Sequence, residues 1–320
     1  MNFNTLKKLP TLRKVMPYIP FDRGAGGHRI GLRPLSECLP WFVFDEDEEI
    51  QKTMKMEILH RSRARTASHW VAYQGLGGAT LGAQDETYTM IWEALVGSYP
   101  ERRQEFIHAL EDAKALLGGT ASLRLISTLV QDDLCLLEKK DGEWILTAAS
   151  VCFPTSWRLE DKIGQSVNWI HTHSDGGPIG SDTFRAAIDI TIDRLSPGPI
   201  YERTNWFVYR DPVLRHRHGN VIYNPDWTGS EISKYNAGSK LHIRYERQTL
   251  RRLPETDAIL FTIRVYVDPL RRLKEDQRGD LADFVRGYCL HKHEKGQPWK
   301  PWECAMWRYL EERTALESAE

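Results

Sequence analysis

The stretch "LCLLEKKDGEWILTAASVCF", residues 134–153, holds two apolar runs that flank Asp141 and Gly142. An Asp-Gly pair between such runs is the strongest short-range signal for a β-hairpin, because a tight type I′ turn needs residues that tolerate positive φ. The sequence therefore predicts two antiparallel strands joined by a tight turn. This hairpin places the chain among proteins that are built around an antiparallel sheet.

Three later segments are expected to add strands to this sheet. "RTNWFVYR" (203–210) alternates in polarity and puts Arg203 and Asn205 on the same face. "KLHIRYERQTL" (240–250) and "AILFTIRVYV" (258–267) also alternate, which is the period of a strand with two unlike faces. We therefore expect about five strands in the middle of the chain.

Helical periodicity and helix-end signals occur before, between and after these strands. The segments expected to be helical are residues 45–64, 100–119, 181–195, 275–288 and 301–317. Residues 1–35 carry Pro, Gly and Arg and are predicted to form an irregular arm. We predict an α+β fold in a single domain over residues 1–320, with a core at 36–270 and C-terminal helices at 271–320.

Composition bounds the compartment and the partners. Of the 320 residues, 41% are hydrophobic and 27% are charged, and a net charge of −1 gives no field that would attract nucleic acid or an anionic membrane. Five scattered cysteines without a C-x-x-C pair argue against a structural zinc site or a self-contained iron–sulfur centre. Neither a signal-type apolar run nor a stretch of ~18–20 apolar residues is present. We expect a cytoplasmic protein that binds neither nucleic acid nor membrane.

Two enzyme classes are disfavoured because their motifs are missing. No G-x-S-x-G occurs, so the sequence does not indicate a nucleophilic triad. The glycine-rich stretches at residues 24–31 and 75–82 neither follow a convincing strand nor open a helix. They therefore do not support a nucleotide-binding cradle.

Histidines recur in His-x-His pairs, which on a strand would face one side and could chelate zinc or iron. The pairs are His171/His173, His216/His218 and His291/His293. The second and third pairs lie in polar, basic surroundings, where we expect them to be solvated. The first follows Trp169 and Ile170, and an imidazole beside apolar side chains is typical of a haem iron ligand. A buried histidine with an ordinary hydrogen bond is the alternative.

Arginines recur in the predicted strands, at Arg203, Arg244, Arg247 and Arg264. An inward arginine in a sheet needs an anionic partner, because an unpaired buried charge is costly. The acids available nearby in the sequence are Glu202, Glu246 and Asp257. Alternatively, the arginines bind the carboxylates of a ligand, such as haem propionates, through paired hydrogen bonds.

Longer motifs follow one another in a fixed order: "GLRPLSECLPWFVFDEDEEIQKTMKMEIL" (31–59), "VQDDLCLLEKKDGEWILTAASVCFPTSWRLEDKIGQSVNWIH" (130–171), "YERTNWFVYR" (201–210) and "IRYERQTLRRLPETDAILFTIRVYVDPL" (243–270). Together they resemble the haem-dependent oxidative N-demethylase family, in particular its alpha, haem-bearing subunit. The resemblance covers roughly residues 31–271, and its most specific part runs from Asp132 to His171.

The resemblance implies a PAS-like antiparallel sheet that forms a haem pocket, with helical N- and C-terminal extensions. It implies that haem b iron activates O2 and oxidises the N-methyl group of a small secondary amine such as dimethylamine. Electrons would come from NADPH through separate subunits that carry flavin and an iron–sulfur centre. Formaldehyde would be released, or passed to tetrahydrofolate on a partner subunit.

Site residues follow from the same resemblance. His171 matches the motif histidine and is predicted to be the axial ligand of the haem iron, with His173 as second choice. The predicted catalytic residues are Arg203, Asn205 and Glu246, and the predicted cofactor-binding residues are His171, Arg203, Trp206 and Arg247.

One departure bears on the substrate. Family members tend to continue x-Pro-Val-Pro after the histidine, whereas this chain continues Thr-His-Ser-Asp-Gly-Gly. Ser, Asp and Gly leave the backbone looser than prolines would.

Two rival functions stay open at this stage. A haem-binding PAS-type sensor or partner-docking protein would keep the cofactor without turnover. A non-haem metalloenzyme would use His171 and His173 together and would contain no porphyrin.

Overall fold

The computed structural model describes residues 31–63, 72–77, 80–119, 121–155, 157–173, 182–215, 228–294, 296 and 299–317. Most of the predicted N-terminal arm, residues 1–30, and the pair His216/His218 lie outside the described residues.

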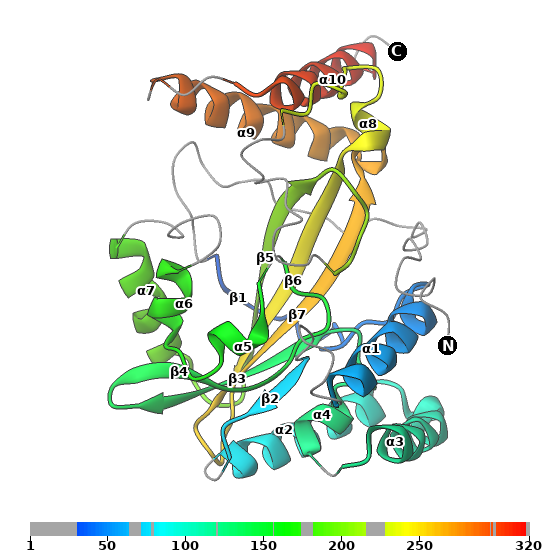
Figure 1. Ribbon diagram of the computed structural model, residues 1–320, viewed down its shortest axis with the longest axis vertical. Coiled ribbons are helices and arrows are strands. Elements are labelled where there is room, and N and C mark those ends of the chain that lie inside the picture. The colour runs from blue at the N-terminus through cyan, green and yellow to red at the C-terminus, as the bar shows by residue number, and fades with distance from the viewer. Residues whose placement is uncertain are drawn as a thin grey trace.

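The core of the fold is one antiparallel sheet of seven strands in the order β1-β5-β6-β7-β3-β4-β2 (Figure 1). The strands are β1 (Arg33–Pro34), β2 (Tyr73–Gly75), β3 (Asp133–Lys140), β4 (Glu143–Ser150), β5 (Ile200–Tyr209), β6 (His242–Arg252) and β7 (Ile259–Pro269). The α+β class and the antiparallel sheet are therefore confirmed.

Helices surround the sheet on both faces and at one end (Figure 1). They are α1 (Glu48–Arg63), α2 (Thr80–Ser98), α3 (Arg103–Leu117), α4 (Ser122–Ile126), α5 (Leu159–Lys162), α6 (Val167–Thr172), α7 (Asp182–Asp193), α8 (Ala237–Lys240), α9 (Glu275–Glu294) and α10 (Pro301–Glu317), with 3-10 turns η3 (Pro100–Arg102) and η4 (Leu270–Arg272).

The predicted hairpin is confirmed by its turn geometry. Asp141 and Gly142 have φ angles of 52° and 86°, and Lys140 pairs with Glu143 across the turn. Both turn residues thus adopt the positive φ that a type I′ turn requires. The helix expected within residues 100–119 is also present, and Gly118 ends α3 in the left-handed conformation with φ 59°.

Short elements depart from the sequence-based expectation. Arg33 and Pro34 form strand β1, although they fall within the predicted irregular arm, and β2 was also not predicted. These strands have two and three residues, too few for alternation to be visible. Pairing to longer neighbours makes them strands. The single-domain organisation stays a prediction.

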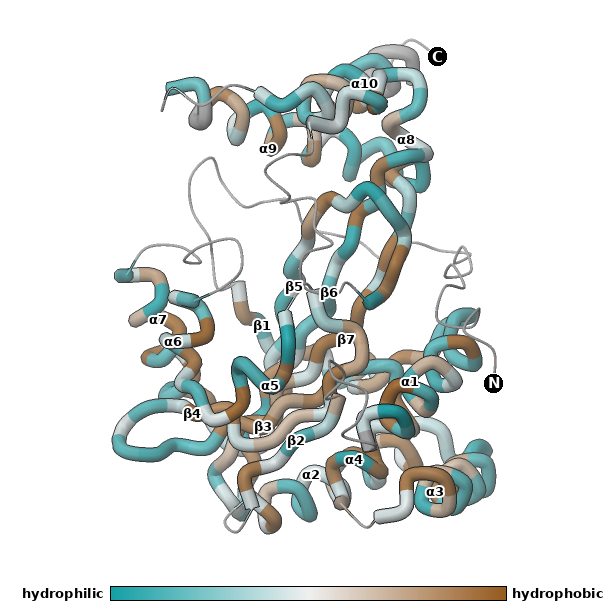
Figure 2. Tube along the Cα trace, viewed as in Figure 1, coloured by the Kyte–Doolittle hydropathy of each residue, from teal (hydrophilic) through white to brown (hydrophobic). Residues whose placement is uncertain are grey.

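Alternation along β3 divides the core between the two faces of the sheet. Leu134 and Leu136 pack with residues of α2, α3 and α4, whereas Cys135 and Leu137 pack with residues of α5, α6 and α7. Figure 2 shows the corresponding pattern, with mostly hydrophobic residues on the central strands β3 and β7 and a hydrophilic β3–β4 turn. Helices α5, α6 and α7, which cover the face of Cys135 and Leu137, carry the candidate site.

The C-terminal helices pack on the far ends of the long strands. Trp206, Tyr245 and Tyr266 of β5, β6 and β7 share a cluster with Val285 of α9 and Leu310 of α10. Figure 1 shows α9 and α10 lying across this end of the β5–β7 ribbon. The predicted C-terminal helices therefore extend the core instead of standing apart from it.

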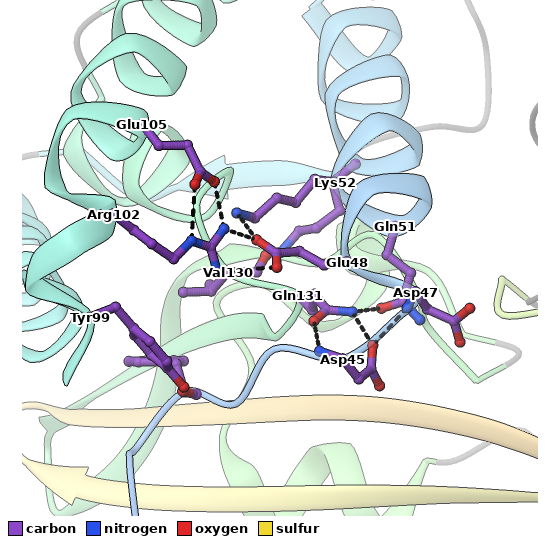
Figure 3. Close-up of polar contacts among 12 residues, drawn as sticks. Asp45, Asp47, Glu48, Gln51, Lys52, Tyr99, Arg102, Glu105, Val130 and Gln131 are labelled. Carbon is purple, nitrogen blue, oxygen red and sulfur yellow. Dashed lines mark hydrogen bonds and ion pairs between the residues drawn. The ribbon is translucent and has the colours of Figure 1, made fainter. Parts of the chain in front are cut away.

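Buried polar contacts attach the start of α1 to the sheet. The Arg264 guanidinium of β7 donates to Asp45 at 2.9 Å and also to the side-chain oxygen of Gln51. The Gln131 amide donates to the same two residues, at 3.0 Å each (Figure 3). Arg264 thus has the carboxylate partner that a buried arginine requires. That partner is Asp45, which is distant in sequence and is not among the acids expected from the sequence.

A second set of charges in Figure 3 joins α1 to the start of α3. Glu48 accepts from Lys52 at 2.6 Å and from Arg102 at 2.5 Å. Both cations lie over the Phe44 ring, with 4.7 Å and 4.5 Å to its centroid. These ion pairs and cation–π contacts fix α1 against the start of α3.

Replacing Arg264 by Met is expected to lower the free energy of unfolding by about 3 kcal/mol, because Asp45 and Gln51 would keep buried polar atoms without this donor. Urea unfolding followed by circular dichroism measures the change. The matched control is Arg158→Met, which removes a pair with Asp161 in which both side chains are 41% exposed. That variant should change stability by less than about 1 kcal/mol, and equal effects would contradict the anchoring role of Arg264.

Candidate functional site

Helix α6 determines the orientation of His171. The helix begins after Ser166, whose hydroxyl accepts a hydrogen bond from the Trp169 amide at 3.3 Å. One turn later, Nδ1 of His171 lies 2.7 Å from the Val167 carbonyl oxygen. A carbonyl can only accept, so Nδ1 carries the proton and Nε2 is the nitrogen with a lone pair. An imidazole oriented in this way is prepared to bind a metal through Nε2.

The surroundings of His171 favour its neutral form. Burial is the main cause that lowers the pKa of His171, while the Val167 carbonyl opposes that shift. Three positive charges lower the pKa further, those of Arg203, Arg185 and Lys162. Only a neutral imidazole can coordinate iron, so the shift favours the ligating form.

His173 differs from His171 in its exposure. It is exposed and its ring stacks on Trp169 at 4.2 Å, although its Nδ1 also lies close to the carbonyl four residues earlier, that of Trp169, at 3.0 Å. The pair lies at the end of helix α6 and not on a strand, so the condition for a shared face is not met, because residues two apart on a helix point in different directions. Within the described ranges, no three His, Cys, Asp or Glu side chains are grouped to hold a metal ion.

Strand pairing gathers the predicted catalytic residues on one face of the sheet. Asn205 of β5 lies opposite Glu246 of β6, and Arg203 lies opposite Gln248. Directly opposed residues of an antiparallel pair share a face. The prediction that Arg203 and Asn205 face the same way is therefore confirmed, and Glu246 joins them. We call Arg203, Asn205, Glu246 and Gln248 the site face. The positive charge of Arg203 is one of the causes that lower the pKa of His171.

The site face is tied together by side-chain hydrogen bonds. Arg203 donates to the Gln248 oxygen at 3.2 Å, and the Gln248 amide nitrogen donates to Glu246 at 2.9 Å. The other carboxylate oxygen of Glu246 accepts from Thr155 at 3.0 Å. Arg244 lies 3.7 Å from the same carboxylate. Charged and polar groups are thus buried with partners, as a low-dielectric site requires.

The predicted cofactor-binding set is divided between the two faces. Trp206 lies on the opposite face from Arg203, where its ring meets Phe284 of α9 edge-on at 4.8 Å. Arg247 also lies there and donates to Glu202 at 3.1 Å and to the Trp41 carbonyl at 2.7 Å. Successive residues of a strand point to opposite faces, so the structure does not bring Trp206 and Arg247 to His171.

Two buried cations near His171 were missed by sequence reasoning. Arg185 of α7 and Lys162 of α5 are each 7% exposed; Arg185 pairs with Asp182, and Lys162 donates to the His173 carbonyl at 2.7 Å. In sequence both resemble ordinary charges on helix surfaces. With Arg203 they help to lower the pKa of His171, and such positive charges fit a metal ligand beside an anionic group such as a haem propionate.

A helix-borne neutral imidazole beside buried cations, over an antiparallel sheet, is a site of the kind found in haem proteins. The family described as haem-dependent oxidative N-demethylase, alpha subunit-like, matches residues 38–297. The match covers most of the chain, and the chain belongs to this family. Its name indicates a haem-dependent, N-demethylase-like enzyme that forms part of a multi-subunit assembly. No helix in the described part of the chain is long and apolar enough to cross a membrane.

The neutral state of His171 predicts a pH dependence of stability. As the pH falls below 6.5, the ordinary histidine pKa, toward the lower pKa of folded His171, the unfolded chain takes up a proton that the folded chain does not. The free energy of unfolding should therefore fall in this window. His171→Gln removes the contribution, so the variant should lose less stability than wild type between about pH 7 and about pH 5 in urea unfolding. Identical slopes would contradict a buried neutral imidazole.

Proposed function

We propose that this chain is the haem-binding subunit of an oxidative N-demethylase. Haem b would bind over a PAS-like sheet, where Nε2 of His171 would hold its iron. The reaction uses O2 and external electrons to remove the N-methyl group of a small secondary amine, such as dimethylamine, as formaldehyde. The observation that carries the proposal is the His171 imidazole, whose Nδ1 is bonded to the Val167 carbonyl at 2.7 Å.

The surrounding residues have distinct roles in this proposal. Arg203, Arg185 and Lys162 supply positive charge for the haem propionates, and Arg203 is the member of this set on the site face. Asn205 offers an amide to the reacting groups, and Glu246 offers a fixed carboxylate to a cationic amine. His173 remains second choice as ligand. Trp206 and Arg247 act from the opposite face by fixing β5 and β6.

Bound haem would supply the reduction of O2 and the oxidation of the N-methyl carbon. One oxygen atom of O2 would enter the N-methyl C–H bond to give a carbinolamine, while two external electrons and two protons would convert the other atom to water. The carbinolamine then breaks its C–N bond to yield formaldehyde and the smaller amine. The protein's own contribution is to orient the imidazole, to keep it neutral and to hold charges at fixed positions. Such preorganised charge costs no rearrangement during the reaction.

Electron supply must come from elsewhere in the assembly. The five cysteines are free, and three of them are buried in different parts of the fold, at Cys135, Cys152 and Cys289. This distribution supports partner subunits that carry flavin and an iron–sulfur centre and take electrons from NADPH. A tetrahydrofolate-binding subunit could receive the formaldehyde. We propose a cytoplasmic location for this assembly.

An absorption spectrum tests the ligand assignment. Protein produced with added haem precursor should show an intense Soret band, and His171→Ala should lose or shift it because the axial nitrogen is removed. His173→Ala is the matched control and should keep the wild-type band. Loss of the band in both variants, or only in His173→Ala, would contradict the assignment.

Turnover is tested on the same wild-type sample. Formaldehyde release from dimethylamine, in the presence of O2 and a chemical reductant, is expected. A Soret band without formaldehyde from any small amine would favour the non-catalytic haem sensor. Iron or zinc without a Soret band would favour the non-haem metalloenzyme.

A further inference from the structure

A continuous chain of hydrogen bonds connects two arginines beneath the candidate site. Arg244 Nε donates to the Thr155 hydroxyl at 2.8 Å, and Thr155 donates to Glu246 at 3.0 Å. On the other side, Arg203 donates to the Gln248 oxygen at 3.2 Å, and Gln248 donates to Glu246 at 2.9 Å. Glu246 is therefore the common acceptor at the centre of the chain.

The chain can have only one direction. A guanidinium has donors and no acceptor, so the Thr155 oxygen must accept from Arg244 and give its own proton to Glu246. For the same reason the Gln248 oxygen must face Arg203, and its amide nitrogen must face Glu246. Glu246 thus accepts at both of its carboxylate oxygens, from Thr155 on one side and from Gln248 on the other.

The two ends of the chain differ in burial. Arg244 is 0% exposed, and its two terminal nitrogens donate to the carbonyls of Leu214 and Phe153 at 2.7 Å each. Arg203 is only partly buried and is the end whose charge reaches His171. The buried Arg244 therefore holds Thr155 in place, and the hydrogen bonds through Glu246 and Gln248 extend this constraint to the Arg203 side chain.

We propose that Gln248 is a positioning residue that holds the Arg203 guanidinium for a haem propionate, and that Glu246 and Thr155 fix the orientation of the Gln248 amide. The proposal rests on the proposed haem-binding function and adds residues to it. An amide suits this position because it is neutral. A carboxylate at residue 248 would pair with Arg203 directly and cancel the charge that an external anion needs, whereas a hydrocarbon would leave the guanidinium without its contact.

The probes are haem and haem dimethyl ester, whose propionates carry no charge. Soret titrations give the dissociation constant of each with the 320-residue chain. Wild type should prefer haem by about tenfold or more, the range of one charge-assisted hydrogen bond. Arg203→Met should remove the share of this preference that Arg203 supplies, leaving the share of Arg185 and Lys162. The near-isosteric Gln248→Met should remove a large part of the Arg203 share.

The double variant shows whether Gln248 acts through Arg203. The preference of Arg203→Met with Gln248→Met should equal that of Arg203→Met alone, because a positioning residue has nothing left to position. The matched control is Gln84→Met, which removes another buried glutamine, in α2, whose side-chain oxygen accepts from Tyr73 of β2 at 2.7 Å. It should keep the wild-type preference.

Each contrary result has a separate meaning. An unchanged preference in Gln248→Met, additive losses in the double variant, or an equal loss in Gln84→Met would overturn the positioning role while leaving haem binding intact. Absence of any Soret band in wild type would overturn the proposed function, and this inference with it.

Discussion

The antiparallel pairing of β5 with β6 is the constraint on which the candidate site depends. This register sets Arg203 opposite Gln248 and Asn205 opposite Glu246, so four polar side chains from distant parts of the sequence share one face. A slip of β6 by one residue would turn Glu246 and Gln248 to the other face of the sheet, away from Arg203 and Asn205. The hydrogen bonds among Arg203, Gln248 and Glu246 in turn stabilise this register, because a shifted pairing would separate these groups and bury them without these contacts.

The same strand serves the opposite face with its alternate residues. Arg247 and Thr249 both hold Trp41, through its carbonyl at 2.7 Å and its indole nitrogen at 2.8 Å. Thr249 continues to Thr262 at 2.7 Å, and Thr262 to Asp132 at 3.4 Å. The run from residue 246 to residue 249 therefore builds the site with one pair of side chains and secures the N-terminal segment with the other. This division explains why the two halves of one motif have different structural roles.

Electrostatics connects the sheet to helix α6. His171 is kept neutral by burial and by surrounding positive charge, while its Nδ1 proton is held by the Val167 carbonyl. Cations that disfavour an imidazolium also attract anions, so the proposed metal ligand and the proposed propionate contacts depend on the same arrangement of charges. The family to which the chain belongs uses haem, which agrees with this combination of features.

Local pattern alone determined the hairpin at Asp141-Gly142, the long strands, and the shared face of Arg203 and Asn205, because turn propensity and alternation act between neighbouring residues. The motif match singled out His171, but neither signal predicted that it lies on a helix. Only the tertiary structure decided that Gln248 lies beside Arg203 and that the helix-borne Arg185 comes near His171. Such proximities depend on strand register and on how helices pack over the sheet, and no local pattern encodes either one.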